Sequence, residues 1–412
     1  MPDPLSGLRV LDFSRQTAGG AATRILANYG AEVLRVEWPE PPGLDFVRLL
    51  YPADGEVGLN RGGMFNGLNV DKRSVTLNMS TSGGRDLAAR LVEISDVVYD
   101  NMTPGVMARW GLDFAALQRL RPDVIYVSCS GFGHTGPRAA YRSYGGPSAA
   151  HTGIGHLAGL PGRPPAGWGF AYADYTAAWA NAVAILMALE RRRRTGRGVF
   201  VDSAQTQSTV THLGEFFLRY GVNGMRSRDP SFPPGNRRIA PCVAPHGAYP
   251  CAGDDTWCVI AVYTDDEWAA LKEAMGCPAW ADQAELDHTA GRFANQAALD
   301  EALGAWTRGY DRYELVAALQ ARGVAAGVVQ GGTDRLQRDP QLAHRGTFAV
   351  YDHPETGPRR HETVAARLRG APYRPTRAAP LLGQDNDFVL RGLLGLSDAD
   401  LARLGAEDAV RW

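Results

Sequence analysis

Asp174 is the residue of this chain with the clearest potential for covalent chemistry. A carboxylate can attack an activated carbonyl carbon, and the anhydride that forms stays reactive toward a second nucleophile. Asp174 stands between Tyr172 and Tyr175 in an otherwise uncharged stretch, after a long segment rich in Gly, Pro and Ala. An aspartate at a helix start also serves as an N-cap, because its oxygen accepts a backbone N–H. From these residues alone, both roles stay open.

Three histidines of the same long segment, His134, His151 and His156, offer acid–base chemistry, although loop histidines often only form hydrogen bonds to their surroundings. The sequence contains no HExxH or HxH pattern, so we expect no metal site. It also lacks a G-x-S-x-G elbow and a P-loop pattern, which excludes the α/β-hydrolase and P-loop ATPase classes.

Gly19 and Gly20 follow the first apolar segment, and Glu37 ends the second. A glycine turn and an acid so placed are typical of dinucleotide-binding folds, but the G-x-G-x-x-G spacing is not met. We therefore expect a tight turn at a helix N-terminus, whose backbone N–H groups can hold an anion other than NAD.

The elements that must position these residues alternate between strands and helices. Expected strands are Leu8–Phe13, Glu32–Trp38, Ser74–Leu77, Asp96–Tyr99 and Val124–Ser128, and expected helices are Ala21–Tyr29, Ser82–Ile94, Phe114–Arg119 and Asp174–Arg194. Such alternation predicts a doubly wound α/β sheet. Arg191–Arg194 and Gly196 close the last helix, since cations and glycine suit a helix C-terminus.

The second half of the chain predicts a smaller unit. A segment mixed in Pro, Gly and charge precedes it. Its expected strands are Trp257–Val262 and Ala325–Val329, and its expected helices are Asp266–Met275, Gln296–Thr307 and Arg312–Arg322. We divide the chain into a large domain with Asp174, a linker, a small domain, and a second linker with a C-terminal return to the large domain: 1–215, 216–245, 246–335 and 336–412.

Composition indicates an ordinary globular protein. The formal net charge of -1 argues against nucleic-acid partners and against adhesion to anionic membranes. The start MPDPLSGLRV resembles no signal peptide, and we find no apolar run of about 18 residues that could span a membrane. The five cysteines are scattered without a CxxC pair, which favours reduced thiols. We expect a cytoplasmic protein.

Segments in order along nearly the whole chain carry a family resemblance. They are PLSGLRVLDFSR, LNVDKRSVTLNMSTSGGR, SDVVYDNMTPGVMARWGL, RPDVIYVSCSGFGHTGP, ADYTAAWANAVAILMALERRRRTGRGVFVDSA, PHGAYPCAGDDTWCVIAV, RDPQLAHRGTF and APLLGQDN. The chain resembles the class III CoA-transferase family, also called CaiB/BaiF, which includes formyl-CoA transferase and carnitine CoA-transferase. The resemblance implies a Rossmann-like large domain plus a smaller α/β domain, in an interlocked, ring-like dimer.

The resemblance also implies an activity and its residues. The family aspartate that opens the long helix is Asp174 here. The implied CoA-binding positions are Lys72, Arg73, Asn101, Met102 and Arg109. Gln16, Thr17 and Ala18 would lie by the reacting carboxylate, and the active-site loop would hold Tyr144, Gly145 and Gly146, with backbone N–H groups for an oxyanion.

The implied reaction moves CoA between an acyl-CoA donor and an organic acid through an aspartyl anhydride and an aspartyl-CoA thioester. A serine ester would be too stable to return its acyl group to a thiol, whereas an anhydride is not. Coenzyme A thioester is then a substrate, and no permanently bound cofactor is expected. Family habit suggests succinyl-CoA as donor.

This sequence departs from the family pattern at a few positions. The first turn reads A-G-G where A-G-P is usual, Trp38 stands where a basic residue is frequent, and Gly145 replaces an acid that often follows the tyrosine. One alternative is a 2-methylacyl-CoA racemase, which needs a His/Asp acid–base pair, but its G-H-D-x-N-Y stretch is missing from this sequence. Another is a subunit of a heteromeric transferase with a related chain in place of a homodimer.

Overall fold

The computed structural model describes residues 3–158, 163–226, 235–239, 241–373 and 375–412. The chain forms two compact units, each of them α/β. Unit 1 comprises Met1–His156, Gly167–Gly214 and Gln341–Trp412, and unit 2 comprises Leu157–Ala166 and Glu215–Pro340. The C-terminal residues thus belong to the same unit as the N-terminal ones.

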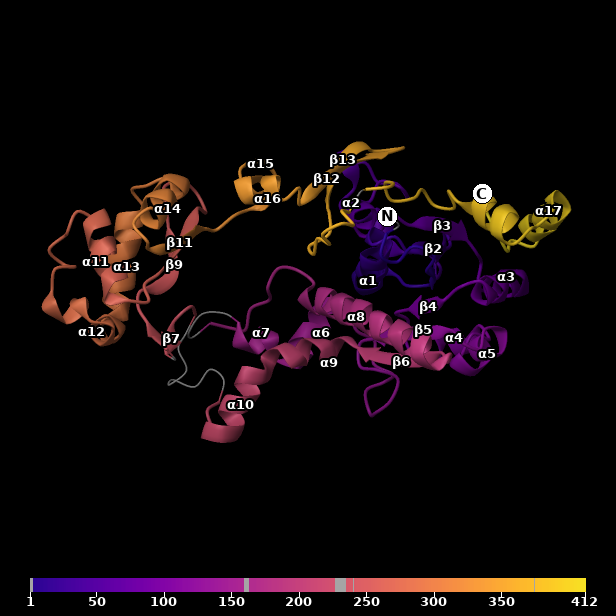
Figure 1. The fold of residues 1–412 in the computed structure, drawn as a ribbon, viewed down its shortest axis with the longest axis horizontal. Coiled ribbons are helices and arrows are strands. Elements are labelled where there is room, and N and C mark those ends of the chain that lie inside the picture. The colour runs from indigo at the N-terminus through magenta and orange to yellow at the C-terminus, as the bar shows by residue number, and fades with distance from the viewer. Residues whose placement is uncertain (1–2, 159–162, 227–234, 240, 374) are drawn as a thin grey trace. The chain divides into compact units, whose positions relative to one another are not determined.

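Unit 1 is built on a six-stranded parallel sheet of order β3-β2-β1-β4-β5-β6 (Figure 1). The strands are β1 (Arg9–Asp12), β2 (Glu32–Glu37), β3 (Arg73–Thr76), β4 (Val97–Asp100), β5 (Ile125–Ser130) and β6 (Val199–Ala204). This is the strand order of the Rossmann fold, with the reversal between β1 and β4. The expected α/β class and Rossmann-like unit are therefore confirmed.

Helices cover both faces of this sheet. They are α1 (Gln16–Asn28), α2 (Gly63–Leu68), α3 (Ser82–Glu93), α4 (Val106–Arg109), α5 (Phe114–Leu120), α6 (Gly145–Thr152), α7 (Ile154–Leu157), α8 (Tyr172–Thr195) and α9 (Gln205–Val210). Short 3₁₀ turns are η1 (Phe46–Leu49), η2 (Ala53–Gly55) and η3 (Thr211–Leu213). The C-terminal elements are α16 (Pro340–His344), the β12 (Phe348–His353) and β13 (Gly357–Glu362) hairpin, the π-helix η5 (Asp387–Leu393) and α17 (Asp398–Ala406).

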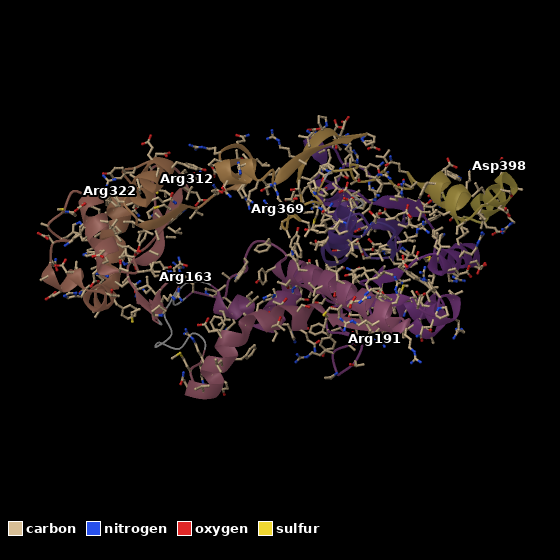
Figure 2. All side chains as sticks on the ribbon, viewed as in Figure 1. Arg163, Arg191, Arg312, Arg322, Arg369 and Asp398 are labelled. Atoms are coloured by element: carbon tan, nitrogen blue, oxygen red, sulfur yellow. The ribbon has the colours of Figure 1, made fainter. Side chains whose placement is uncertain are left out.

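The central strands are apolar on both faces because two hydrophobic cores sandwich them. Val10 points to the core formed with α1 and α8, whereas the next residue, Leu11, points to the core formed with α3 and the C-terminal helices. On the first face α1 and α8 pack against each other (Figure 1). Arg191 marks the C-terminal end of α8 (Figure 2), where its guanidinium donates to the Arg197 and Gly198 carbonyls.

Unit 2 has its own core around a three-stranded antiparallel sheet of order β11-β10-β9. Its strands are β7 (Arg238–Ile239), β8 (Cys242–Val243), β9 (His246–Pro250), β10 (Trp257–Ala261) and β11 (Ala325–Val328). Its helices are α10 (Gly214–Asn223), α11 (Asp265–Ala274), η4 (Ala284–Asp287), α12 (Thr289–Ala294), α13 (Gln296–Thr307), α14 (Arg312–Gln320) and α15 (Gly332–Gln337).

Three expectations of local structure need correction. Gly19 and Gly20 form no turn, because they lie inside α1, where a Cβ on Gly19 would come within 2.1 Å of the Ser14 Cβ. Their small size permits close packing and offers no anion site. The long segment after β5 contains α6 and α7, and the expected linker contains α10; residues 159–162, 227–234 and 240 lie outside the described part. The strand β6 and the β12–β13 hairpin were not expected.

Candidate active site

A cavity of about 350 Å³ lies at the carboxyl ends of the unit 1 strands, beside the reversal between β1 and β4. Ligands of open α/β sheets bind at this point, because loops diverge there. The segments that follow β1, β4 and β5 form its walls together with α8 and α9. Its lining residues are Arg15, Gln16, Thr17, Ala18, Leu44, Asp45, Phe46, Asn101, Met102, Thr103, Cys129, Gly131, Arg142, Ser143, Tyr144, Asp174 and Gln205.

Asp174 occupies the first turn of α8 and lines this cavity. It is not the N-cap, which is Ala171, and no side chain caps the helix. The backbone N–H of Asp174 donates to the Ala171 carbonyl at 3.0 Å, which leaves the carboxylate free of the capping role. An anion in the first turn also benefits from the helix dipole. The capping interpretation of Asp174 is therefore wrong for this structure.

Among the described residues, one side-chain amide donates a hydrogen bond to the Asp174 carboxylate. Gln205, the first residue of α9, donates its side-chain N–H to Oδ1 of Asp174. Oε1 of Gln205 accepts a hydrogen bond from Ser148 at 3.2 Å, and Ser148 lies 2.6 Å from Ser143. Since Oε1 accepts from Ser148, the amide turns its NH₂ group toward Asp174. The chain Ser143–Ser148–Gln205–Asp174 orients the carboxylate.

Burial raises the pKa of Asp174 to about 6, and the hydrogen bond from Gln205 acts in the opposite direction by stabilising the charged form. The carboxylate is consequently more basic and more nucleophilic than an exposed aspartate, but it remains mostly ionised at neutral pH. Perturbed carboxylates in a cavity are frequent at functional sites. Basicity together with ionisation suits a carboxylate that must attack a carbonyl carbon in its deprotonated form.

Gly145, at the N-terminus of α6, faces the same carboxylate. A Cβ at position 145 would lie 2.7 Å from Oδ2 of Asp174, so this position tolerates no side chain without movement. The N–H groups of Gly145 and Gly146 donate to no other described residue, as expected for a first helical turn. Tyr144, the N-cap, is 62% exposed and also lines the cavity. The expected active-site loop therefore lies beside Asp174.

The segment after β1 is fixed from two sides. Oδ1 of Asn101 accepts the Arg15 backbone N–H at 2.8 Å, and Nδ2 of Asn101 donates to the Arg15 carbonyl at 2.8 Å. Gln16 has a left-handed φ of 56°, an uncommon conformation for a non-glycine residue, and Asp45 accepts its N–H at 3.1 Å. Gln16, Thr17 and Ala18 thereby line the Asp174 cavity, as expected from the resemblance.

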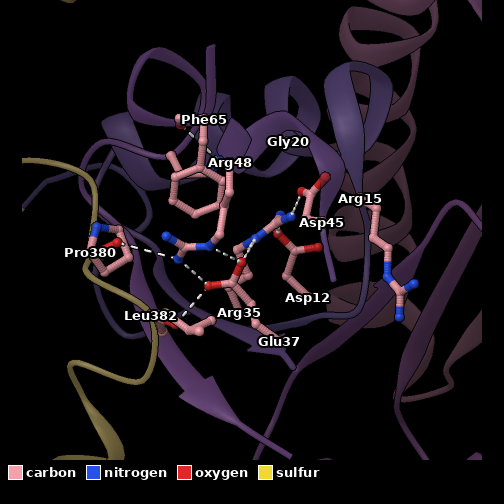
Figure 3. Close-up of polar contacts among 12 residues, drawn as sticks. Asp12, Arg15, Gly20, Arg35, Glu37, Asp45, Arg48, Phe65, Pro380 and Leu382 are labelled. Atoms are coloured by element: carbon pink, nitrogen blue, oxygen red, sulfur yellow. Dashed lines mark hydrogen bonds and ion pairs between the residues drawn. The ribbon is translucent and has the colours of Figure 1, made fainter. Parts of the chain in front are cut away.

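A buried cluster of ion pairs contacts the segment after β1 through Asp45, which accepts the Gln16 N–H (Figure 3). Arg35 is fully buried and pairs with Asp12 at 3.5 Å, with Glu37 at 3.2 Å and with Asp45. Arg48 donates to Glu37 at 2.6 Å and stacks 3.6 Å over the Phe65 ring. These cations hold the pKa of Glu37 at about 2 despite its burial. Glu37, whose place at the end of the second strand is typical of dinucleotide-binding folds, is thus a structural ion-pair partner here.

Lys72 and Arg73 lie elsewhere. Nζ of Lys72 is fully buried and donates to the Gly20 carbonyl, the Thr23 hydroxyl and the Asn69 side chain at 2.8, 2.7 and 2.9 Å. Arg73 pairs with Asp385 at 3.0 Å and stacks 3.9 Å over Phe388. Neither residue lines the Asp174 cavity or the cavity next to it. The structure does not place these two residues with the other expected CoA-binding positions.

A second cavity, of about 490 Å³, adjoins the first, since Arg15 and Met102 line both. Arg109, at the end of α4, and the buried Trp38 also line it. The guanidinium of Arg109 has no ion-pair partner among the described residues. The two cavities together offer space for a small reacting group beside Asp174 and for a longer, anionic carrier beyond Arg15.

The loop histidines do not line the Asp174 cavity. His134 lies 2.8 Å from the Ser128 hydroxyl, and His151 lies 2.5 Å from the Arg138 guanidinium. In the described ranges, no group of three His, Cys, Asp or Glu residues is arranged to hold a metal ion. A helix both long and apolar enough to cross a membrane is also missing from the part of the chain described here.

Comparison with known proteins gives concordant matches. CoA-transferase family III matches residues 5–386. A succinyl-CoA--D-citramalate CoA-transferase of Chloroflexus aurantiacus is 33% identical, covering 99% of this chain and 98% of that protein. A succinyl-CoA--L-malate CoA-transferase alpha subunit of the same species is 32% identical, covering 99% of this chain and 92% of that protein. A crystal structure of a CaiB/BaiF family protein from Brucella suis has a TM-score of 0.85 at 30% identity, covering 95% of this chain and 100% of that one.

Proposed function

Since the chain belongs to CoA-transferase family III and is a CoA-transferase, we propose that it exchanges CoA between two carboxylic acids with Asp174 as its covalent nucleophile. The observation that carries the proposal is the environment of Asp174. Its carboxylate lines a cavity, has a pKa raised to about 6, and is oriented by Gln205 against a glycine that leaves room for a reacting group.

The first half of the proposed reaction loads CoA onto the protein. The Asp174 carboxylate attacks the thioester carbonyl of the donor, the C–S bond breaks, and CoA leaves as a thiolate with a mixed anhydride left behind. The thiolate then attacks the Asp174 carbonyl carbon, and the donor acid departs as a carboxylate. The product is an aspartyl-CoA thioester, and no proton is gained or lost.

The second half repeats these steps with the acceptor. Its carboxylate attacks the aspartyl thioester and forms a new anhydride, with CoA thiolate as the leaving group. The thiolate attacks the acceptor's acyl carbon and regenerates the Asp174 carboxylate. Water must be kept away during these steps because anhydrides hydrolyse.

Each addition produces a tetrahedral oxyanion that needs donors. Gly145 and Gly146 open α6 with N–H groups that have no acceptor among the described residues, and Gly145 lies against the Asp174 carboxylate, where an oxyanion would form. Backbone donors fixed in this way stabilise a transition state without reorganisation. We assign this role to the two glycines; Gln16, Thr17 and Ala18 line the same cavity as Asp174.

The second cavity is the proposed place for the CoA carrier. Arg15 stands between the cavities and Arg109 lines the outer one, so both guanidinium groups are suitably placed for the phosphates of CoA. Directly after β4, Asn101 lines the Asp174 cavity and Met102 lines both cavities. Lys72 and Arg73 have no part in this assignment because their contacts hold them elsewhere.

A racemase would need an acid–base pair around the substrate α-carbon. Within the described chain, the Asp174 cavity contains no histidine, and Asp45 is engaged with Arg35. These observations favour the transferase mechanism over the racemase alternative.

The donor and the assembly are finer proposals. Two relatives carry succinyl-CoA in their names, and we propose succinyl-CoA as donor here as well.

We also propose a homodimer, because α8 exposes Tyr175, Trp179, Val183 and Leu186 at helical spacing, each between 41% and 52% exposed. Such apolar faces mark association surfaces. A heteromer with a related chain remains the alternative, as one relative is named an alpha subunit.

The test is the mass of the purified chain after incubation with a panel of acyl-CoA thioesters. Hydroxylamine or borohydride traps the intermediate, and peptide mapping finds the labelled residue. We expect the label on Asp174 and none on Asp174→Asn. Unlabelled protein with every thioester, while CoA still binds, would exclude Asp174 as nucleophile and leave the racemase or a silent subunit.

A further inference from the structure

Asp100 is a buried carboxylate that the proposed reaction does not use. It is the last residue of β4, it is 1% exposed, and it lines neither cavity. Its oxygens accept hydrogen bonds from the Met102 backbone N–H at 2.8 Å, the Tyr126 hydroxyl at 2.7 Å and the Ser128 hydroxyl at 3.2 Å. Among the described residues, no arginine or lysine forms an ion pair with Asp100. The buried charge therefore depends on these three donors.

The Ser128 hydroxyl depends in turn on His134, one of the loop histidines that line neither cavity. A hydroxyl carries a single proton, and that of Ser128 is donated to Asp100, so its oxygen accepts a hydrogen bond from Nε2 of His134 at 2.8 Å. The backbone N–H of His134 donates to Asp202 at 3.0 Å, and the imidazole ring meets Phe200 edge-on with the ring centroids 5.3 Å apart. A chain of hydrogen bonds thus connects β6, β5 and β4 near their carboxyl ends.

We propose that His134 is a positioning residue for the wall between the two cavities and that it acts through Ser128 and Asp100. The inference rests on the function proposed above, in which CoA spans both cavities. His134 does not touch the reacting atoms. Its imidazole supplies one N–H donor, which keeps the Ser128 hydroxyl turned toward the Asp100 carboxylate.

The wall consists of Asn101 and Met102, which directly follow Asp100. Met102 lines both cavities, and its N–H is held by the Asp100 carboxylate. Asn101 lines the Asp174 cavity, and its amide holds the Arg15 backbone through two hydrogen bonds of 2.8 Å. A shift at Asp100 would therefore move the segment along which the CoA carrier passes from the outer cavity to Asp174.

The balance of charge at Asp100 makes the wall sensitive to this chain. Burial raises the pKa of Asp100 above its ordinary value, and the hydrogen bonds from Tyr126, Met102 and Ser128 act in the opposite direction. Oδ1 of Asp100 accepts both the Ser128 hydroxyl and the Met102 N–H. When the Ser128 hydroxyl is free to rotate away, the disturbance falls on the oxygen that holds the wall.

The first experiment replaces the imidazole with amides of two lengths in the full-length chain. His134→Gln can place an amide N–H where Nε2 of the imidazole lies, whereas the side chain of His134→Asn is too short to reach Ser128. We expect His134→Asn to weaken equilibrium binding of CoA about 3- to 10-fold and His134→Gln to stay within about twofold of wild type, since one hydrogen bond is at stake. In His134→Asn, KM for succinyl-CoA and for butyryl-CoA should rise by the same factor with kcat within about twofold of wild type, because the wall serves the carrier and not the acyl group.

Hydrogen–deuterium exchange measures the wall itself, without any turnover. The peptide that contains the Met102 N–H should exchange faster in His134→Asn than in wild type, while peptides from α3 should exchange at the wild-type rate. Ser128→Ala should have the same effects as His134→Asn. The double change Ser128→Ala with His134→Asn should bind CoA no more weakly than Ser128→Ala alone, because both changes interrupt one chain.

His151→Asn is the matched control, since His151 belongs to the same long segment, contacts Arg138 at 2.5 Å and lines neither cavity. It should leave CoA binding unchanged. Wild-type CoA binding in His134→Asn, or equal losses in His134→Gln and His134→Asn, would overturn the inference. Full additivity of Ser128→Ala and His134→Asn would also overturn it. If no thioester labelled Asp174, the transferase mechanism would be refuted, and the CoA-binding comparison would still decide the role of His134.

Discussion

Gly145 and Asp174 lie so close that a side chain on Gly145 would begin 2.7 Å from Oδ2 of Asp174. The two residues are distant in sequence, and the packing of α6 against α8 brings them together. The glycine therefore serves the site by its lack of a side chain, since it lets a helix N-terminus approach the carboxylate.

Gly145→Ala should displace the Asp174 carboxylate or close the space in front of it. We expect kcat to fall about 10- to 100-fold, because small misplacement of a reacting group is costly. The melting temperature should change little, since alanine is a better helix former than glycine. Gly214→Ala is the control: it also opens a helix, and its Cβ would have no neighbour within 4 Å. Full activity of Gly145→Ala would contradict the close-approach argument.

Gln205 should act as a positioning residue for Asp174. Its hydrogen bond lowers the pKa of that carboxylate, so Gln205→Leu should raise this pKa above about 6. The acid limb of the kcat/KM profile should then move to higher pH, and kcat should fall about tenfold from lost orientation. Gln207→Leu, an exposed change on the same helix, should leave both unchanged. If the acid limb of the kcat/KM profile of Gln205→Leu stayed at the wild-type pH, Gln205 would have only a structural role.

Asp174 should link activity and stability to pH with opposite signs. Activity needs the ionised form, so kcat/KM should decline below about pH 6. Because the folded-state pKa is raised, the carboxyl stabilises the fold at low pH, and this contribution is lost as pH rises through about 6. Asp174→Asn should thus be inactive but more stable than wild type at pH 8.

The expected gain of Asp174→Asn is about 1–2 kcal/mol at pH 8, less than the roughly 3 kcal/mol that two pKa units imply, because partial exposure screens the charge. Thermal unfolding of both proteins between pH 4 and 9 measures it. Melting curves that differ equally at pH 4 and pH 8 would show that burial does not perturb this carboxyl.

Arg109 should bind the CoA part of every thioester. Arg109→Met should raise KM for succinyl-CoA and butyryl-CoA alike, about tenfold, since a hydrogen bond to a charged group contributes about 1.5–3 kcal/mol. Arg119→Met, an exposed change on α5, is the control. A change that depended on the acyl group would place Arg109 at the acyl end instead, and the carrier would need another site.

Much of the unit 1 fold could be predicted from the sequence because its strands are short apolar runs between helices of clear periodicity. The predicted turn at Gly19 and Gly20 was wrong, since glycine occurs at sites of close packing as well as in turns. Here the close contact with Ser14, which the sequence does not reveal, explains the glycine at position 19. The strand β6 escaped prediction because it is only partly buried, so its apolar residues do not stand out.

The candidate site was predictable to a lesser degree. The family resemblance named Asp174 and the loop with Tyr144 and Gly145; Asp174 and Tyr144 do line one cavity, and Gly145 lies against the Asp174 carboxylate. Gln205 was missed, because nothing in an uncharged helix start signals which distant carboxylate its side chain will meet. Lys72 reads as a surface cation in sequence, and only the fold reveals that its ammonium is buried among hydrogen-bond acceptors.

The Glu37–Arg48 pair should dominate the acid stability of unit 1. Glu37 and Arg48 are joined at 2.6 Å in a buried cluster, and the pKa of Glu37 is lowered to about 2. A lowered pKa stabilises the fold fully above about 4.5, and this stabilisation is lost as pH falls toward 2. Arg48→Met should cost about 3–5 kcal/mol at pH 7, because it leaves the buried Glu37 with Arg35 alone, a cation that also serves Asp12 and Asp45.

Urea unfolding at pH 7 and at pH 3–4 measures this prediction. The difference between wild type and Arg48→Met should shrink at the lower pH, where the remaining carboxylate of the variant becomes protonated and no longer needs a cation. The double change Glu37→Gln with Arg48→Met should recover part of the loss at pH 7, since neither charge is then orphaned. Arg403→Met, which breaks an exposed pair with Glu407 on α17, should cost no more than about 0.5 kcal/mol. If Arg48→Met cost no more than Arg403→Met, the cluster would not be what holds the segment with Gln16 in place.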